Sequence, residues 1–296
     1  MTPLKLKNNA YLLLTMAVLF WAGNFILGRA FHSDIPPISL AFWRWFCASL
    51  LISGPAFRHL RRDRHTIRNH WPVVLLLAAL GIAAFNTLAY SGLQYTQAIN
   101  AFLMQSLMPV LIVLFSFLLF GERVGPRQTL GILVSLAGAV AIIARGDLAV
   151  LAALEFNRGD LLVAAAILCY AGYSVMLRKR PPVHPLSLIA VIFWLGSAII
   201  LPFYLWETLF VRPLALQPVT FTVVGYVALF PSIVSYLCFN RGVELIGANR
   251  AGLFIHLMPV FGSLMAILFL GESFYWYHAL GICLIAAGIV LASRGK

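Results

Sequence analysis

The sequence has too little charge to be an ordinary soluble protein. Only 10% of its 296 residues are charged and 62% are hydrophobic, whereas a typical soluble domain has roughly 25% charged residues. The mean hydropathy is +0.94. These values exclude a soluble globular fold, and we predict that the chain lies in a lipid bilayer.

Cysteine is also scarce, and the motifs of several enzyme classes are missing. The four cysteines fall inside apolar stretches without CxxC spacing, so we expect neither a metal site nor a disulfide: Cys47, Cys169, Cys238 and Cys283. There is no HExxH, GxGD, nucleophile elbow or P-loop. We therefore expect no cofactor, no intramembrane enzyme and no ATP-driven pump. A channel would need a ring of charges or a carbonyl filter, and none stands out.

Long apolar runs fill the chain from end to end. Segments of about 20 residues, which span a ~30 Å hydrocarbon core as a helix, follow one another with short polar breaks, and no alternation typical of a barrel strand occurs. The predicted fold is an all-α integral membrane protein with ten transmembrane helices. The predicted spans are 10–31, 37–57, 71–93, 98–120, 126–145, 158–178, 186–206, 218–241, 247–270 and 275–293.

The basic residues predict how the chain is oriented. There are 21 Lys and Arg against 9 Asp and Glu. With ten spans, sixteen of these basic residues fall on the side of the two termini, and four lie on the other: Arg29, Arg145, Arg158 and Arg212. Because cytoplasmic loops carry the excess of Lys and Arg, both termini are predicted to be cytoplasmic, and we expect no nucleic acid as a partner. The basic stretch 58–68, predicted to be a loop, is interpreted as a topology anchor; contact with anionic membrane lipid is the alternative.

One stretch of the sequence occurs twice. A shift of 150 residues aligns LMPVLIVLFSFLLFGE (107–122) with LMPVFGSLMAILFLGE (257–272), and 17 of 43 positions are identical between 98–140 and 248–290. We therefore predict two five-helix repeats, 1–145 and 158–296, joined by a linker at 146–157. Because five is odd, the second repeat must cross the membrane in the opposite sense, as in many secondary transporters.

The repeat also pairs two prolines. Pro109 and Pro259 lie about half-way along the fourth and ninth spans, where proline removes a helical hydrogen bond and bends the helix. A matched pair of bends fits a hinge or a binding cavity; a static kink is the alternative.

These features resemble a known family. Two five-helix repeats, each with the pattern Pro-x11-Gly-Glu followed by LGI and AG, together with FWAGNFILGRA at 20–30, are similar to the drug/metabolite transporter superfamily, EamA type. The resemblance implies a ten-helix transporter of the bacterial inner membrane, with helices 1–4 and 6–9 around a cavity and helices 5 and 10 at the periphery. It implies a small-molecule substrate. Amino acids, which similar members export, are favoured; sugars, nucleosides and other drug-like or lipid-linked compounds are the alternative.

Polar side chains within the spans are the candidates for a substrate-binding cavity, because polar groups are costly in hydrocarbon. Asn24 and Asn86 of the first half correspond to Tyr173 and Tyr236 of the second half. Hydrogen bonding between helices is the alternative role. The candidate set is Asn24, Arg44, Asn86, Tyr90, Gln105, Tyr173, Tyr236 and His256.

Arg44 and His256 are the two candidates that can carry a charge. Arg44 lies seven residues after Pro37, about 10 Å into the bilayer at 1.5 Å per residue, where it could extend outward to the headgroups or face a cavity. A cavity arginine predicts a substrate with a carboxylate or phosphate. His256 could carry a proton or only form hydrogen bonds.

The acidic residues bear on the transport mechanism. All nine map to loops or span ends, so we expect no buried carboxylate for a proton relay. The sequence therefore predicts export by alternating access, as facilitated diffusion or exchange. It does not define the oligomeric state, and a monomer is our working assumption.

Overall fold

The computed structural model describes residues 9–96, 98–147, 149–153, 157–270 and 273–293, and within these ranges it contains helices and turns but no strand. Eight helical segments in the described part are long and apolar enough to cross a bilayer, and a shorter apolar helix covers Trp276–Ala292. The predicted all-α membrane fold is confirmed, while the total of ten spans stays a prediction.

The first half of the chain contains five helical segments, two of which are interrupted. They are α2 (Ala10–Ala30), α3 (Pro37–Asn69), then α4 (Trp71–Ala78) continued by the π-helical η1 (Ala79–Ala84) and α5 (Phe85–Leu93), then α6 (Ala98–Gln105) with α7 (Met108–Phe120), and α8 (Pro126–Ile143). Pro37, Pro72 and Pro126 each lie in the first turn of a helix, where a missing N–H costs no hydrogen bond.

A short helix, α9 (Ala149–Ala152), follows within the predicted linker. The second half then contains α10 (Arg158–Met176) with the 3₁₀ turn η2 (Leu177–Lys179), α11 (Pro185–Trp206) with the π-helical η3 (Glu207–Val211), then α12 (Pro218–Ala228), the π-helical η4 (Leu229–Val234) and α13 (Ser235–Ile246), then α14 (Ala248–Gly252), the 3₁₀ turn η5 (Leu253–His256) and α15 (Leu257–Leu270), and finally α16 (Trp276–Ser293).

Local structure recurs at the same 150-residue offset as the sequence. The π-helical segments η1 and η4 begin at residues 79 and 229 and end at 84 and 234. Likewise, α8 and α16 begin at 126 and 276 and end at 143 and 293. The two halves therefore share irregularities of the backbone as well as apolar composition.

The basic stretch 58–68, predicted to be a loop, is helical. It forms the second part of α3, which continues through Pro55 to Asn69. The prediction was wrong because low hydropathy was taken as the end of the helix, although the stretch contains no glycine or further proline to stop it. At 33 residues, and 1.5 Å per residue, α3 is about 50 Å long and exceeds a ~30 Å hydrocarbon core.

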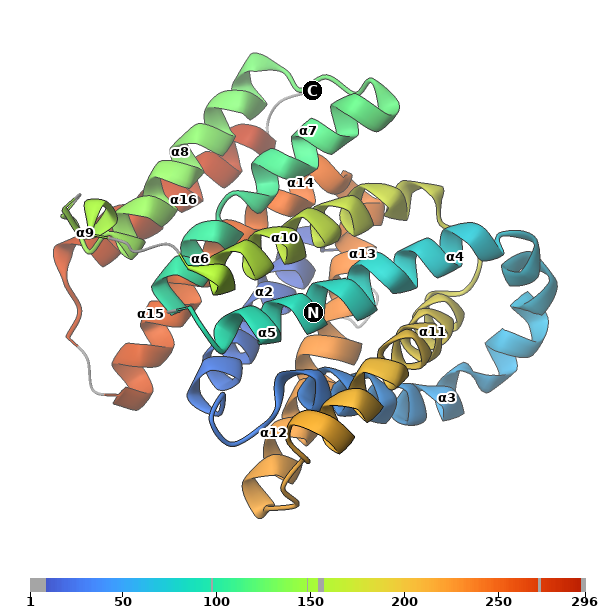
Figure 1. The fold of residues 1–296 in the computed structure, drawn as a ribbon. Coiled ribbons are helices and arrows are strands. Elements are labelled where there is room, and N and C mark those ends of the chain that lie inside the picture. Colours follow the sequence, from blue (N-terminus) through green and yellow to red (C-terminus); the bar gives the residue numbers. More distant parts are fainter. Residues whose placement is uncertain (1–8, 97, 148, 154–156, 271–272, 294–296) are drawn as a thin grey trace.

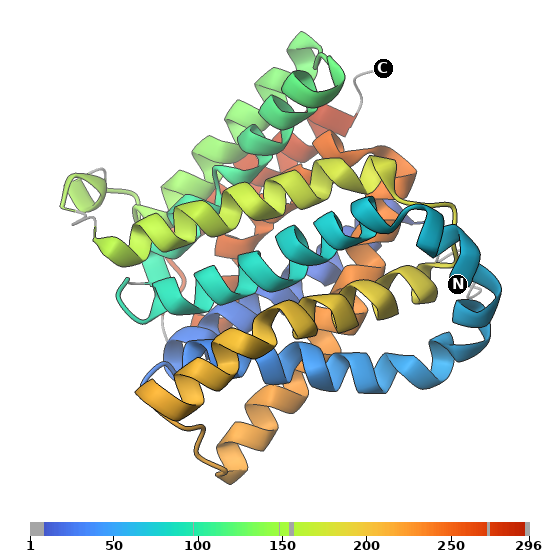
Figure 2. The same ribbon diagram turned by 45° about the vertical axis from the view of Figure 1, so that its right-hand side comes forward.

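The helices pack as a bundle with one pair set to the side. In the core, α10 packs on α5, α13 on α2 and α3 on α11, and the buried side chains form one continuous cluster. By contrast, α8 and α16 lie along each other at one margin of the bundle (Figures 1 and 2). A Cβ added to Gly131 would come within 2.6 Å of the Gly288 carbonyl oxygen, so glycine is what allows these two backbones to approach.

Candidate functional site

A proline in mid-membrane opens the backbone beside the candidate site. Pro231 lies within η4 and has no N–H, so the Val227 carbonyl one turn earlier loses its usual helical partner. The Ser232 hydroxyl takes that place and donates to the Val227 oxygen at 2.7 Å. The Pro231 carbonyl in turn accepts from the Trp21 indole at 3.0 Å. The π-helical segment thus presents polar groups to neighbouring helices, as such segments often do at functional sites.

Arg44 is buried at this point and is surrounded by neutral acceptors. Its side chain comes from α3, is 1% exposed and has its guanidinium 4.6 Å from the centre of the Trp45 ring. The sequence allowed the Arg44 side chain either to extend outward to the lipid headgroups or to face a cavity. In the structure it lies inside the bundle. The guanidinium donates to Ser232 Oγ (2.7 Å), Asn24 Oδ1 (3.0 Å), Asn86 Oδ1 (2.8 Å), the Tyr90 hydroxyl (2.8 Å) and the Pro231 carbonyl (3.0 Å).

The charge of Arg44 is not matched by an anion. All five of its acceptors are uncharged, and within the described part of the chain the ion pairs involve other arginines. Its Nη2 atom carries two N–H groups but has a single acceptor in these ranges, the Pro231 carbonyl. Burying a cation without a counter-ion is costly, so this position favours a negatively charged group.

A small cavity adjoins the guanidinium. It measures about 10 Å³ and is lined by the polar side chains of Arg44, Asn24, Asn86 and Gln105. The rest of its lining is aromatic, aliphatic or sulfur-containing: Trp21, Phe25, Phe85, Met108, Tyr170, Ile255 and Met258. Gln105 Nε2 and the Tyr170 hydroxyl are buried without a hydrogen-bond partner among the described residues. Unsatisfied donors of this kind call for an explanation, and here they lie around the same space as Arg44.

The size of the cavity indicates a closed conformation. A volume of about 10 Å³ holds about one water molecule, whereas small-molecule pockets have roughly 300–1,000 Å³. Met108 and Met258 line it from the two halves at equivalent positions, 150 residues apart. A molecule larger than water could enter only if the residues that line the cavity moved apart.

The structure brings five of the eight candidate residues together and places the other three elsewhere. Asn24, Arg44, Asn86 and Tyr90 are joined by hydrogen bonds, in which the Tyr90 hydroxyl also donates to Asn24, and Gln105 lines the same cavity. Tyr173, Tyr236 and His256 do not line it.

Tyr173 and Tyr236 belong to an aromatic cluster next to the cavity. Their rings lie 5.7 Å apart, and the Tyr170 ring is 5.2 Å from Tyr173. The Tyr173 hydroxyl donates to Asn240 at 2.8 Å, and the Tyr236 hydroxyl donates to the Gly81 carbonyl in η1. The amides of the first half therefore face the cavity, while the tyrosines at the equivalent positions pack behind it.

His256 connects η5 to α8 and to the turn between α6 and α7. Its Nε2 lies 2.9 Å from the Ser106 carbonyl and must donate to it, so Nδ1 accepts from the Ser135 hydroxyl at 2.7 Å. Ser106 is the residue equivalent to His256 across the repeat, 150 positions earlier. It lies in the turn between α6 and α7, next to Pro109, whereas Pro259 follows the 3₁₀ turn η5. Both predicted hinge positions thus lie at breaks in helical structure.

Two carboxylates are buried, which corrects the expectation that none would be. Asp160, 1% exposed, accepts from Thr96 Oγ1, from Asn100 Nδ2 at 3.2 Å and from the Asn157 backbone at 2.7 Å. Glu207, 4% exposed, accepts from the backbone of Ile38 (3.1 Å) and Ser39 (2.6 Å) and from the Ser39 hydroxyl (2.8 Å). Both lie at helix ends, as predicted, but they are enclosed because each satisfies N–H groups at the start of a helix.

Sequence reasoning missed several residues of the site. Trp21 and Tyr170 occupy equivalent places in the two halves, in WAG and YAG, and this pairing was a usable signal. Ser232 directly follows Pro231, a proline in the middle of a predicted span, and this position was a second usable signal. Met108 and Met258 are identical in the two copies of LMPV, which was a third signal. Phe85 carries no signal of its own, because apolar side chains that line a cavity look like those that face lipid.

Comparison with known proteins agrees with this architecture. The profile of the EamA-like transporter family matches residues 8–144 and again 157–294. A crystal structure of 23% sequence identity superposes with a TM-score of 0.77 and covers 96% of each chain, which shows a shared fold.

Relatives of similar length come from bacteria and archaea. The chain is 26% identical to the uncharacterized transporter YyaM of Bacillus subtilis, over 96% of this chain and 93% of that protein. It is 27% identical to an uncharacterized transporter of Archaeoglobus fulgidus, over 97% and 98%. It is 25% identical to a protein of Streptantibioticus cattleyicolor named as a probable terminal-alkyne amino-acid exporter, over 95% and 92%. The chain is thus a multi-pass membrane protein that belongs to the EamA-like transporter family of the drug/metabolite transporter superfamily.

Proposed function

We propose that this transporter exports small carboxylate-bearing metabolites, with amino acids as the favoured class, across the bacterial inner membrane. Transport would proceed by alternating access, as facilitated diffusion or exchange. The observation that carries the proposal is the buried, unpaired guanidinium of Arg44 at a closed cavity shared by the two halves.

The donors around the cavity suit a carboxylate. The second Nη2–H of Arg44, Gln105 Nε2 and the Tyr170 hydroxyl are hydrogen-bond donors without a partner in the described structure. A carboxylate has two oxygens that can accept several such bonds, and charge-assisted bonds are the stronger kind. Binding a carboxylate would satisfy these donors and supply the counter-ion that Arg44 lacks.

The other wall of the cavity suits an apolar side chain. It consists of Trp21, Phe85, Tyr170, Met108 and Met258. Aromatic rings and flexible thioethers can enclose hydrophobic groups of different shape. The aromatic rings also attract a cation that lies over the ring face. The α-amino group of an amino acid is such a cation. The Streptantibioticus relative, whose printed name contains amino-acid export, supports the same substrate class.

Counterflow in proteoliposomes tests the proposal. The purified protein would be reconstituted with unlabelled amino acids inside, and uptake of a labelled panel followed. We expect saturable uptake of several amino acids that is stimulated by unlabelled substrate on the opposite side. Uptake that is linear with concentration would indicate a channel. A panel without any uptake would move the substrate to sugars, nucleosides or lipid-linked compounds.

Variants at Arg44 connect the activity to the site. Arg44→Ala removes the charge, and Arg44→Lys keeps it but has three N–H donors in place of five, too few to hold the present acceptors and also bind a carboxylate. We expect both to lower uptake by tenfold or more, with Lys the milder. Arg127→Ala removes an exposed arginine that lies at the start of α8 and should retain the wild-type rate. Wild-type transport by both Arg44 variants at equal expression would refute the role of this residue.

A further inference from the structure

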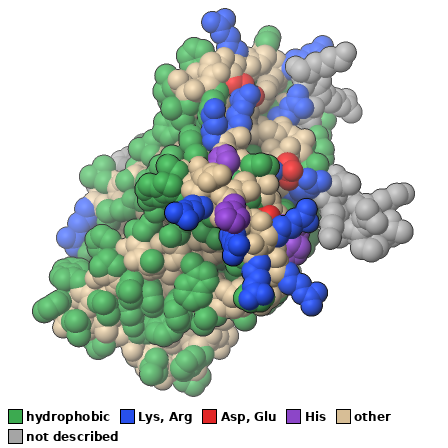
Figure 3. Space-filling model, turned by 90° about the vertical axis from the view of Figure 1, so that its right-hand side faces the viewer, with side chains coloured by type: hydrophobic (Ala, Val, Ile, Leu, Met, Phe, Trp, Pro, Cys, Tyr) green, Lys and Arg blue, Asp and Glu red, His purple; other side chains and the backbone are tan. Residues whose placement is uncertain are grey.

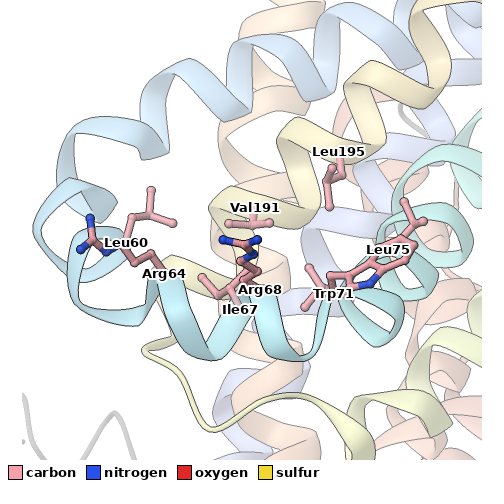
Figure 4. Close-up of a pocket in the computed structure, with 9 residues that line it drawn as sticks. Leu60, Arg64, Ile67, Arg68, Trp71, Leu75, Val191 and Leu195 are labelled. Atoms are coloured by element: carbon pink, nitrogen blue, oxygen red, sulfur yellow. The ribbon is translucent and has the colours of Figure 1, made fainter.

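A second hollow lies near the end of α3, some twenty residues along that helix from Arg44. It measures about 550 Å³ and lies between the last turns of α3, the start of α4 and the first half of α11 (Figure 4). The partly exposed side chains of Leu75, Val191 and Leu195 form its apolar part, and Arg64 and Arg68 lie on α3 beside it. Neither the family nor the proposed transport cycle assigns this groove a role.

The two arginines share one face of the helix. They are four residues apart, which places them one above the other, and Figure 4 shows Arg68 next to Val191. Both are exposed, and neither forms an ion pair in the part of the chain that the structure describes. Their charges are therefore available to an anion.

The apolar wall continues from the arginines into the membrane. Val191 and Leu195 lie six and ten residues after Pro185, where α11 begins, which corresponds to depths of about 9 Å and 15 Å along the helix. Trp71 stands at the first turn of α4, 59% exposed, at the level where tryptophan marks the edge of a bilayer. The groove thus has a cationic end at the water boundary and an apolar end in hydrocarbon.

Contacts join the second part of α3 to the start of α11 next to the groove. The His59 ring stacks on His184 with centroids 3.6 Å apart, and Asp63 accepts a 2.9 Å hydrogen bond from the His184 backbone. These contacts fix the last turns of α3 against the start of α11. Figure 3, which faces this side of the molecule, shows Lys, Arg and His side chains gathered beside a hydrophobic surface.

We propose that this groove binds one anionic glycerophospholipid, with its phosphate at Arg64 and Arg68 and an acyl chain along Leu75, Val191 and Leu195. Basic pockets between membrane helices are known to accept acidic headgroups. A zwitterionic lipid would bring an ammonium group to the same arginines and gain less. A free phosphate would leave the apolar wall exposed.

Fluorescence quenching of Trp71 tests the site in the full-length protein. Phosphatidylglycerol with brominated acyl chains would be added to the protein in mixed micelles, with brominated phosphatidylcholine in parallel. Trp194, Trp206 and Trp276 are also exposed, so the Trp71 signal is taken as the difference between the wild type and Trp71→Phe. We expect the anionic lipid to quench this difference at a mole fraction several-fold lower. Equal quenching of the difference by both lipids, or no quenching of it by either, would overturn the proposal.

Matched variants separate a site from general attraction to the surface. Arg64→Gln with Arg68→Gln should raise the lipid requirement about tenfold or more, since each basic residue contributes to anionic-lipid binding. Arg58→Gln with Arg62→Gln removes the same charge at the same spacing on α3, outside the groove. This pair should change the lipid requirement little. Equal losses in both pairs would contradict a defined site.

The apolar half of the groove is tested without changing charge. Val191→Phe should fill the groove and weaken quenching, while Val290→Phe on the exposed face of α16 should not. Competition by inorganic phosphate at equal headgroup concentration would show that the arginines bind phosphate itself, and would overturn the lipid as occupant. None of these variants touches the Arg44 cavity, so amino-acid counterflow is expected in each of them.

Discussion

Ser232 holds both the helix and the arginine of the candidate site in place. Its hydroxyl donates to the Val227 carbonyl, which Pro231 leaves without a helical partner, and accepts from Arg44 Nε. Ser232→Ala should therefore leave two buried polar groups unpaired, each worth about 1–3 kcal/mol. We expect a clearly lower melting temperature in detergent, together with weaker substrate binding because Arg44 loses one of its supports.

Ser197→Ala is the matched control for Ser232→Ala. The Ser197 hydroxyl is also buried and donates to the carbonyl four residues earlier, at 2.9 Å, but that carbonyl belongs to Phe193 in a helix without a proline at this point. Its loss should change the melting temperature only slightly. Equal effects of the two variants would show that Ser232 has no special role.

At single residues, the sequence predicts which side chains are unusual better than where they point. Arg44 stood out as a cation within a span, but its depth of about 10 Å suited both an outward and an inward side chain. The direction of the Arg44 side chain depends on Asn24, Asn86 and Tyr90. These residues are distant from Arg44 in sequence and contact it only in the folded bundle. Cavity and packing roles for Tyr173 could not be separated for the same reason.

At the scale of elements, the close pair α8 and α16 makes a sharp prediction about glycine. Gly131→Ala would place a Cβ within 2.6 Å of the Gly288 carbonyl and 2.8 Å of Ala292, so the helices must separate. Gly225→Ala in α12 meets nothing within 4 Å and should gain about 0.5–1 kcal/mol from the better helix propensity of alanine. The two variants should therefore shift the melting temperature in opposite directions, and a stabilising Gly131→Ala would contradict the observed packing.

Element boundaries were predictable where proline or the repeat marked them. Pro126 begins α8, and the repeat then locates α16 at 150 residues further on. The second part of α3 was missed because its residues are basic, whereas an amphipathic helix at a membrane surface is expected to have such a face. The π-helical segments were not predicted at all, since propensity and hydropathy do not distinguish them from the surrounding α-helix.

At the scale of the whole molecule, three of the basic residues predicted to share one side of the membrane, Arg178, Arg180 and Arg241, lie together in ion pairs. Glu122 forms an ion pair with Arg178 at 3.1 Å. Glu244 forms ion pairs with Arg180 at 3.0 Å and with Arg241 at 2.9 Å. The first of these pairs links the two halves of the chain. It stands beside a polar hollow of about 500 Å³.

Two of the four basic residues predicted outside donate to backbone carbonyls of segments predicted on that same side. Arg29 donates to the Leu93 carbonyl at 2.9 Å, and Arg212 donates to the Ser33 carbonyl at 2.7 Å. These contacts support the alternation of the spans. They leave open which end faces the cytoplasm, because folded contacts are the same in either orientation.

Labelling of single cysteines decides the orientation. In a variant whose four native cysteines are replaced by alanine, Arg62→Cys and Arg127→Cys mark the arginine-rich end, and Ser33→Cys and Leu216→Cys mark the opposite end; all four positions are exposed. Because Lys and Arg are retained on the cytoplasmic side, an impermeant maleimide should label Ser33→Cys and Leu216→Cys in intact spheroplasts, and Arg62→Cys and Arg127→Cys only after lysis. The reverse pattern would place both termini outside, and labelling of all four in intact spheroplasts would indicate a mixture of orientations.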